Sequence, residues 1–122
     1  MVYPLHLFNF LIKGNIICGW KQGKHYTWHY TGMVDTVSNY KDNRPDGKYY
    51  IWHSNGKLYS IYNYANGKLN GKCYGWHTDG ILFQIFNYKD GLIHGKQLLC
   101  YDNGMIETIA NYENGIPHGI NQ

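Results

Sequence analysis

The apolar and polar positions of this chain recur every 24 residues. Trp28, Trp52 and Trp76 occupy one slot of this period, and Cys100 takes that slot in a fourth copy. Each copy contains two short runs rich in Tyr, Ile, Trp, Phe and Val, which are residue types favoured in strands. The pattern predicts strands over residues 24–29, 48–53, 72–77 and 96–101, and over residues 33–39, 57–63, 81–87 and 105–111. A fixed period of this length indicates a repeat architecture.

Glycines mark the turns between the predicted strands. One column consists of Gly32, Gly56, Gly80 and Gly104, and a second consists of Gly23, Gly47, Gly71, Gly95 and Gly119. The first column closes turns such as Ser54-Asn55-Gly56, where Gly accepts a positive φ. A three-residue loop there pairs Trp52 with Leu58, and a two-residue loop pairs Trp52 with Tyr59. We favour the three-residue loop, because Trp and Leu, Ile or Val fill those two slots in almost every copy.

The links between copies carry a second set of turn residues. The link over residues 65–71 contains two glycines, and we predict longer turns at such links. Asn43 stands where the next link has Gly67, and Asn also tolerates the left-handed region. Asn39, Asn63, Asn87 and Asn111 precede the links, each followed by one residue of the column Tyr40, Tyr64, Tyr88 and Tyr112.

The period divides the chain into one all-β domain of hairpin repeats over residues 1–122. The repeats cover residues 15–39, 40–63, 64–87 and 88–111, and residues 112–122 form a partial repeat. Residues 1–14 match the period poorly. We expect a single strand from Leu5 to Lys13 that caps one end of the array, since terminal segments of repeat arrays are usually atypical.

The column pattern resembles a MORN repeat. The match rests on Tyr64, Asn66, Gly67, Gly71, Trp76, Asp79, Gly80 and Leu82, and on Tyr88, Asp90, Gly91, Gly95, Asn103, Gly104 and Ile106 in the next copy. More narrowly, it is similar to the MORN-repeat variant of bacterial proteins described as antitoxins and of paralogous sets in giant DNA viruses. The resemblance implies a single elongated sheet of consecutive antiparallel hairpins. It implies no particular activity, because MORN arrays serve as scaffolds, membrane-contact modules and appendages of enzymes.

Composition and charge narrow the functional class. The formal net charge is +3, which falls short of the dense basic surface of a nucleic-acid-binding protein, so no nucleic-acid partner is expected. Cys18, Cys73 and Cys100 are odd in number and lack metal-site spacing, which favours a reducing compartment and a cytoplasmic location. The apolar start is too short to span a bilayer and lacks the basic flank of a signal peptide.

Two columns of histidines invite a metal-binding interpretation, and geometry argues against it. His29, His53 and His77 form the first column, and His94 and His118 form the second. Equivalent residues in successive hairpins are two strands apart, about 9–10 Å. Zinc ligands must all lie about 2 Å from one ion. We therefore predict no metal site and no cofactor.

The strongest candidate for partner binding is the lysine column. Lys24, Lys48, Lys72 and Lys96 are predicted to form a row of cations that could meet acidic lipid headgroups or an acidic partner. The alternative is a solvated strand start with a charge that discourages aggregation. The Trp and Tyr columns could stack nucleobases, but we favour a structural role in cross-strand aromatic pairs.

No catalytic arrangement is present, so the chain is predicted not to be an enzyme. The sequence lacks a nucleophile elbow, a P-loop and a Cys–His pair in a recognisable local motif. Three interpretations stay open: a scaffold for a protein partner, with a giant-virus setting in the host cytoplasm or the virion; an antitoxin or immunity protein; and a membrane-surface adaptor.

Self-association through a sheet edge is also expected. The residue 106–111 strand is the predicted open edge, because residues 112–122 could cover it only partly.

Overall fold

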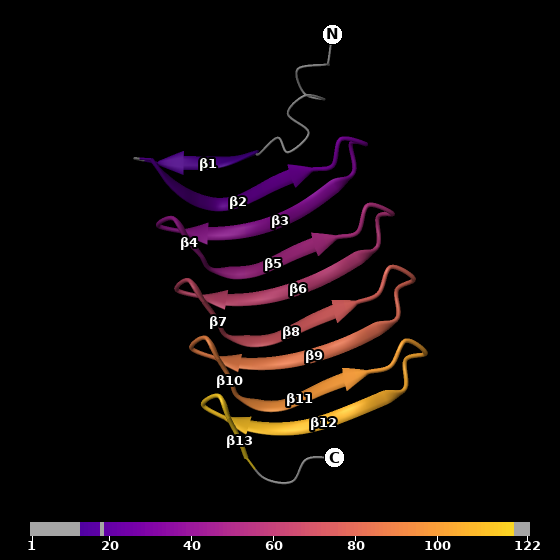
Figure 1. Cartoon of the computed structure of the whole chain (residues 1–122). Coiled ribbons are helices and arrows are strands. Elements are labelled where there is room, and N and C mark those ends of the chain that lie inside the picture. Colours follow the sequence, from indigo (N-terminus) through magenta and orange to yellow (C-terminus); the bar gives the residue numbers. More distant parts are fainter. Residues whose placement is uncertain (1–12, 18, 119–122) are drawn as a thin grey trace.

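The protein is a single open antiparallel sheet whose strands follow one another in sequence order (Figure 1). The computed structural model describes residues 13–17 and 19–118. The strands in these ranges are β1 (Lys13–Ile17), β2 (Trp20–Trp28), β3 (Val34–Lys41), β4 (Arg44–Pro45), β5 (Gly47–Trp52), β6 (Leu58–Ala65), β7 (Lys68–Leu69), β8 (Gly71–Trp76), β9 (Leu82–Lys89), β10 (Leu92–Ile93), β11 (Gly95–Cys100), β12 (Ile106–Glu113) and β13 (Ile116–Pro117). The described ranges contain no helix, and thus none that is long and apolar enough to cross a membrane. The predicted all-β hairpin array is confirmed.

The loop inside each repeat has the predicted three-residue form, followed by a bulge. Trp52 pairs with Leu58, and the Gly56 N–H donates to the His53 carbonyl at 3.0 Å. The next pair is Ile51 with Ser60, so Tyr59 is an extra residue on β6. Such a bulge shifts the rest of the ladder by one residue. The favoured pairing is therefore confirmed at the loop, and the remainder of each hairpin follows the register of the shorter loop.

The links between repeats are tighter than predicted. Asn66 and Gly67 both have positive φ, 52° and 83°, and form a two-residue turn between Ala65 and Lys68. Positive φ at both central positions matches the twist of the flanking strands, which is why this turn type is common in hairpins. The prediction of longer turns was wrong, because each tight turn is followed by a two-residue strand and not by further turn residues. Asn43 replaces Gly as predicted, with φ 67°.

Successive tight turns stack on one another along one side of the sheet. The Gly67 N–H donates to the Pro45 carbonyl, and the Gly91 N–H donates to the Leu69 carbonyl, both at 2.8 Å. A side-chain acceptor joins each step, as where the Asn66 N–H donates to Asp46 Oδ1 at 2.9 Å. The repeats are thus tied together outside the strand ladder as well as within it.

The ends of the array are described in part. The predicted cap strand from Leu5 to Lys13 lies outside the described residues except for Lys13, the first residue of β1. β1 pairs antiparallel with β2, with Ile17 opposite Trp20. At the other end β13 pairs only with Tyr112 and Glu113 of β12.

Burial is sparse, because no second layer covers the sheet in the described part of the chain. The buried hydrophobic residues there are Cys73, Cys100 and Ala110, and the buried polar residues are His25, Ser38, Ser60 and Gln97. Most large side chains are half-buried against their neighbours on the same face. Cohesion therefore depends on contacts within each face and on backbone hydrogen bonds, as expected for repeats that contact only their neighbours.

Candidate interaction surface

The strand register sorts the side chains onto two faces. Successive side chains in a strand point to opposite faces, and paired residues share a face. Lys72, Tyr74 and Trp76 alternate with Cys73 and Gly75 along β8, and the other repeats place the same slots on the same faces. We call the first the basic face, defined by Lys24, Lys48, Lys72 and Lys96. The tyrosine face is the opposite one, defined by Tyr40, Tyr64, Tyr88 and Tyr112, which pair with glycines.

An asparagine clamp positions three of the four lysines that define the basic face. The Asn39 side-chain amide donates to the Lys48 carbonyl at 2.9 Å, and Asn63 and Asn87 make the same bond to Lys72 and Lys96. The Asn63 carbonyl also accepts from the Asn70 N–H at 2.8 Å. Leu69 pairs with Tyr64, whereas Tyr74 pairs with Ile61. Between these two pairs the chain leading to Tyr74 therefore has two residues more than its partner strand, at Asn70 and Gly71. Each clamp therefore fixes where the next long strand begins.

The glycines at the clamp are needed for their backbone conformation. Gly47 and Gly71 have φ of 100° and 102°, a region that residues with a Cβ rarely adopt. A Cβ added at Gly47 would lie 3.4 Å from the Asn39 Cβ, at the short end of ordinary van der Waals contact, so the backbone conformation and not the space requires glycine. The structural role predicted for this glycine column thus has a specific cause.

The four predicted lysines lie in line on the basic face, and all are exposed. They hold the same register, because each pairs with the asparagine of its own hairpin. The Lys48 Nζ donates to Asn63 Oδ1 at 3.2 Å. In the described ranges no carboxylate forms an ion pair with any of the four.

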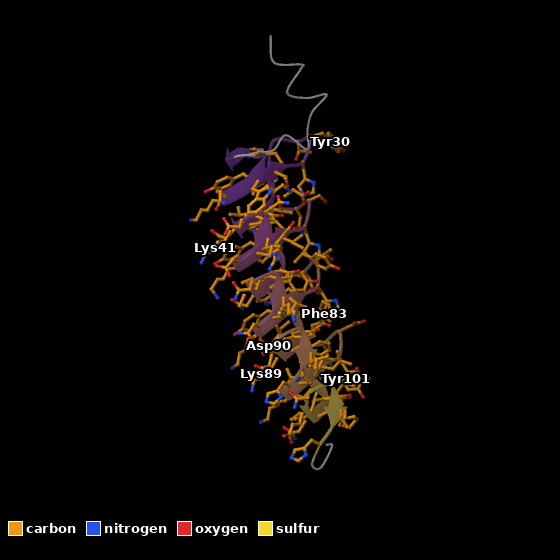
Figure 2. The ribbon with its side chains drawn as sticks, turned by 90° about the vertical axis from the view of Figure 1, so that its left-hand side faces the viewer. Tyr30, Lys41, Phe83, Lys89, Asp90 and Tyr101 are labelled. Atoms are coloured by element: carbon orange, nitrogen blue, oxygen red, sulfur yellow. The ribbon has the colours of Figure 1, made fainter. Side chains whose placement is uncertain are left out.

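Four further cations enlarge this row. Lys41 and Lys89 stand two residues beyond Asn39 and Asn87 and therefore share their face. Arg44 pairs with Lys41, and Lys68 pairs with Ala65, which places both on the basic face. Figure 2 shows Lys41 and Lys89 on one side of the ribbon and Phe83 on the other. The basic face thus carries eight of the chain's 11 Lys and Arg residues, and all eight are exposed.

Sequence reasoning missed these four cations because they do not form a complete column. Ala65 takes the slot of Lys41 and Lys89, and Leu92 takes that of Arg44 and Lys68. The available signal was the two-residue period counted from each clamp asparagine, which assigns Lys41 and Lys89 to its face.

An aromatic and aliphatic band runs beside the cations on the same face. Tyr50 stacks on Trp52 with ring centroids 5.7 Å apart, and Tyr26–Trp28 and Tyr74–Trp76 repeat the contact. These pairs lie along one strand, so the prediction of cross-strand pairs is wrong for the tryptophan column. Cross-strand ring contacts occur instead on the tyrosine face, as between Tyr49 and Tyr64 at 6.1 Å. Aliphatic residues complete the band, for example Leu58 opposite Trp52 and Ile61 opposite Tyr50.

The basic and apolar bands meet in a shallow hollow between two neighbouring lysines. Lys72 and Lys96 flank the hollow, Ile85 and Leu98 supply apolar lining, and His94 borders it. The hollow has a volume of about 350 Å³ and is open to solvent. It joins positive charge to an apolar floor, a combination suited to an acidic partner with some apolar surface.

The tyrosine face is more self-contained. Small buried residues such as Ser38, Ser60 and Cys73 lie among larger aromatic side chains. Burial raises the pKa of Tyr49, Tyr64 and Tyr88, and burial also raises the pKa of the Cys73 thiol. These groups stay neutral near physiological pH, so the three tyrosines and the cysteine add no charge to this face.

The histidine columns serve local contacts. His53 Nε2 lies 3.1 Å from the Trp76 carbonyl, and His77 Nε2 lies 3.5 Å from Asp102 Oδ1 of the next repeat. In the second column the Asn114 N–H donates to His94 Nδ1 at 3.2 Å. Within the described residues no three His, Cys, Asp or Glu side chains gather as metal ligands would. That the protein binds no metal stays a prediction.

The outer edge of β12 is only partly covered by the described residues. β13 pairs with its last two residues, and the His118 N–H donates to the Asn111 carbonyl. No described strand pairs with the outer side of residues 106–110. An apolar hollow lined by Leu99, Thr108 and Ala110 lies near this edge.

Comparison with known families gives one match. A family model described as the MORN repeat variant matches residues 45–66, 69–90 and 93–114, which together make up more than half of the chain. The matched segments recur with the 24-residue period of the sequence, and each starts within an inter-repeat link. A comparison with curated proteins finds no match.

Proposed function

Since the chain belongs to the MORN repeat variant family, we propose that it is a non-enzymatic scaffold that binds an acidic protein partner through its basic face. Repeats of this family are non-catalytic and generally act in protein or membrane interactions. The observation that carries the proposal is the gathering of eight exposed cations beside a stripe of half-exposed Trp, Tyr, Leu and Ile on one face. Aromatic anchors with charged neighbours are typical of partner-binding surfaces.

Charge reversals inside the lysine row and at one exposed lysine outside it test this proposal. Lys48→Glu with Lys72→Glu removes the centre of the lysine row and keeps the backbone carbonyls that accept the clamp bonds, although it also removes the Lys48 Nζ donor to Asn63 Oδ1. Lys57→Glu is a control for charge reversal outside the row, because Lys57 is exposed in a hairpin loop away from it. Affinity capture from the native cell with mass spectrometry should give partners that the double variant loses and the control retains. Partners that bind all three proteins equally would contradict the proposal.

A membrane-surface adaptor is the second candidate, favoured by the same adjacency of lysines and aromatic side chains. Basic residues near an anionic bilayer contribute about 1 kcal/mol each, and Trp and Tyr favour the headgroup region. Co-sedimentation with phosphatidylserine vesicles tests it. Salt-sensitive binding that the double variant loses would favour the adaptor over the protein scaffold.

The biological setting rests on the resemblance alone. A giant-virus protein of the host cytoplasm or virion and an antitoxin that neutralises a toxin are both compatible with a binding scaffold. Many tandem paralogues in the source genome would favour the virus, whereas a neighbouring toxin gene would favour the antitoxin. Self-association through the β12 edge belongs to the same proposal, since an unpaired edge can template pairing with a second copy.

A further inference from the structure

The lysine row has a spacing that specifies the shape of its partner. Lys24, Lys48, Lys72 and Lys96 occupy the same register in successive hairpins. Each repeat adds two long strands to the sheet, and neighbouring strands lie about 4.7–4.9 Å apart. Successive lysines therefore start about 9.4–9.8 Å apart along a line perpendicular to the strands.

A polyproline II segment matches this interval. It rises about 3.1 Å per residue with three residues per turn, so every third side chain points to the same side at intervals of about 9.3 Å. A β-strand covers a similar length in three residues, but its third side chain points to the opposite side. An α-helix places side chains on one side about every seven residues, or 10.5 Å, which drifts by about 1 Å per repeat.

The surroundings of the row suit such a segment. The stacked pairs Tyr26–Trp28, Tyr50–Trp52 and Tyr74–Trp76 lie in the same strands as their lysines and repeat with the same interval. Aromatic-lined grooves are the usual docking sites of proline-rich segments. Between Lys72 and Lys96 the floor is apolar, formed in part by Ile85 and Leu98.

We propose that the basic face binds an acidic, proline-rich polypeptide in the polyproline II conformation, with Asp or Glu at every third position. Each carboxylate meets one lysine of the row, and the prolines between them pack on the aromatic band. The segment lies across the strands and spans the four repeats. This inference rests on the proposed function for the choice of face, and it adds the sequence and conformation of the ligand.

Isomeric synthetic peptides test the spacing. The probe is a fluorescein-labelled peptide of four Glu-Pro-Pro units, and the control isomers contain the same four Glu and eight Pro with the Glu either consecutive or at every second position. Fluorescence anisotropy with the full chain at low salt should give the regular peptide an affinity about fivefold to tenfold higher than that of either isomer. Equal affinity for all three peptides would overturn the inference, because net charge alone would then explain binding.

Variants of the protein locate the site. Lys48→Ala and Lys72→Ala should each weaken binding of the regular peptide and reduce its salt dependence, whereas Lys57→Ala should leave both unchanged. Thermal unfolding of each variant establishes that it is folded. If no peptide binds but the Lys48→Glu, Lys72→Glu double variant still loses its cellular partners, the scaffold function stands and the polyproline ligand is wrong. Vesicle binding that is lost with the same lysines, without peptide binding, would also overturn the ligand and favour the membrane.

Discussion

Gly80 lies in the loop between β8 and β9, and its replacement by Val tests the turn geometry of the repeat. The φ of Gly80 is +91°, where β-branched residues are strongly disfavoured. A Cβ built at this position would meet only the Lys57 Cδ, at 3.8 Å, which is an ordinary contact. The cost of Gly80→Val is therefore conformational strain, and we expect a loss of about 2–3 kcal/mol in the free energy of unfolding.

His77→Ala provides a comparison in the same loop. The His77 ring lies 4.9 Å from the Phe83 ring, and its Nε2 faces the fully exposed Asp102. The aromatic contact contributes about 0.5–1.5 kcal/mol, and an ion pair to an exposed carboxylate adds little. His77→Ala should thus cost about 1 kcal/mol, clearly less than Gly80→Val.

Urea denaturation followed by far-UV circular dichroism measures both losses. With an m value of about 2 kcal/mol/M, the Gly80→Val midpoint should fall by about 1–1.5 M and the His77→Ala midpoint by less. Gly80→Asn supplies a control for strain, because Asn tolerates positive φ better than Val does. Equal midpoints for Gly80→Val and His77→Ala would refute the reasoning, as would an Asn variant no more stable than the Val variant.

Three further predictions concern the clamp, the tyrosine face and the sheet edge. Asn63→Ala removes the donor to the Lys72 carbonyl and should cost about 1 kcal/mol in thermal unfolding, whereas the exposed Lys68→Ala should change stability by less than about 0.5 kcal/mol; equal effects would remove the clamp. Burial raises the pKa of Cys73 above its ordinary 9.0 and the pKa of Tyr49 above 10.0, so the folded protein favours the neutral form of both groups. Their contribution to the free energy of unfolding is therefore complete below about pH 9 and is lost as the pH rises further. Stability that stays constant up to pH 11 in urea titrations would contradict this. Ile109→Pro should reduce self-association in light scattering while the chain stays folded by circular dichroism, and a wild-type chain that is monomeric at high concentration would exclude pairing at this edge.

The architecture could be predicted from the sequence because the same strand and turn signals recur in every repeat. Every copy gives the same strand, turn and glycine positions, so a departure such as Asn43 for Gly strengthens the register. The tight turn at Asn66–Gly67 was not predicted, although Asn-Gly is a strong hairpin signal. The same dipeptide at Asn55–Gly56 closes a different loop in which Gly56 has φ 88° and Asn55 lacks positive φ. The pairing of the strands on either side decides which turn forms, and the Asn-Gly dipeptide itself does not encode that pairing.

The candidate surface was only half visible in the sequence for a related reason. The lysine column could be read directly, because one residue type recurs in one slot. Lys41 follows from the two-residue period after Asn39, but Lys68 lies beyond the tight turn, and only the pairing of β6 with β7 brings it to the face of the row. The role of the asparagine column could not be predicted either. A side-chain amide that donates to a backbone carbonyl across a link gives no sequence signal other than the recurrence of Asn.

The bulge at Tyr59 explains why the sheet has one basic face at all. Near the loop Trp52 pairs with Leu58, and continuing that register would place Lys48 opposite Tyr62. The extra residue instead brings Lys48 opposite Asn63 and Tyr50 opposite Ile61. A one-residue shift moves every side chain of a strand to the other face. Without the bulge, Asn63 and Ile61 would turn away from the lysine and the Tyr–Trp pair, and Tyr62 and Ser60 would take their places. Because equivalent shifts occur between Thr27 and Trp28, between Gly75 and Trp76 and between Leu99 and Cys100, the cations and the apolar band are kept together in all four hairpins.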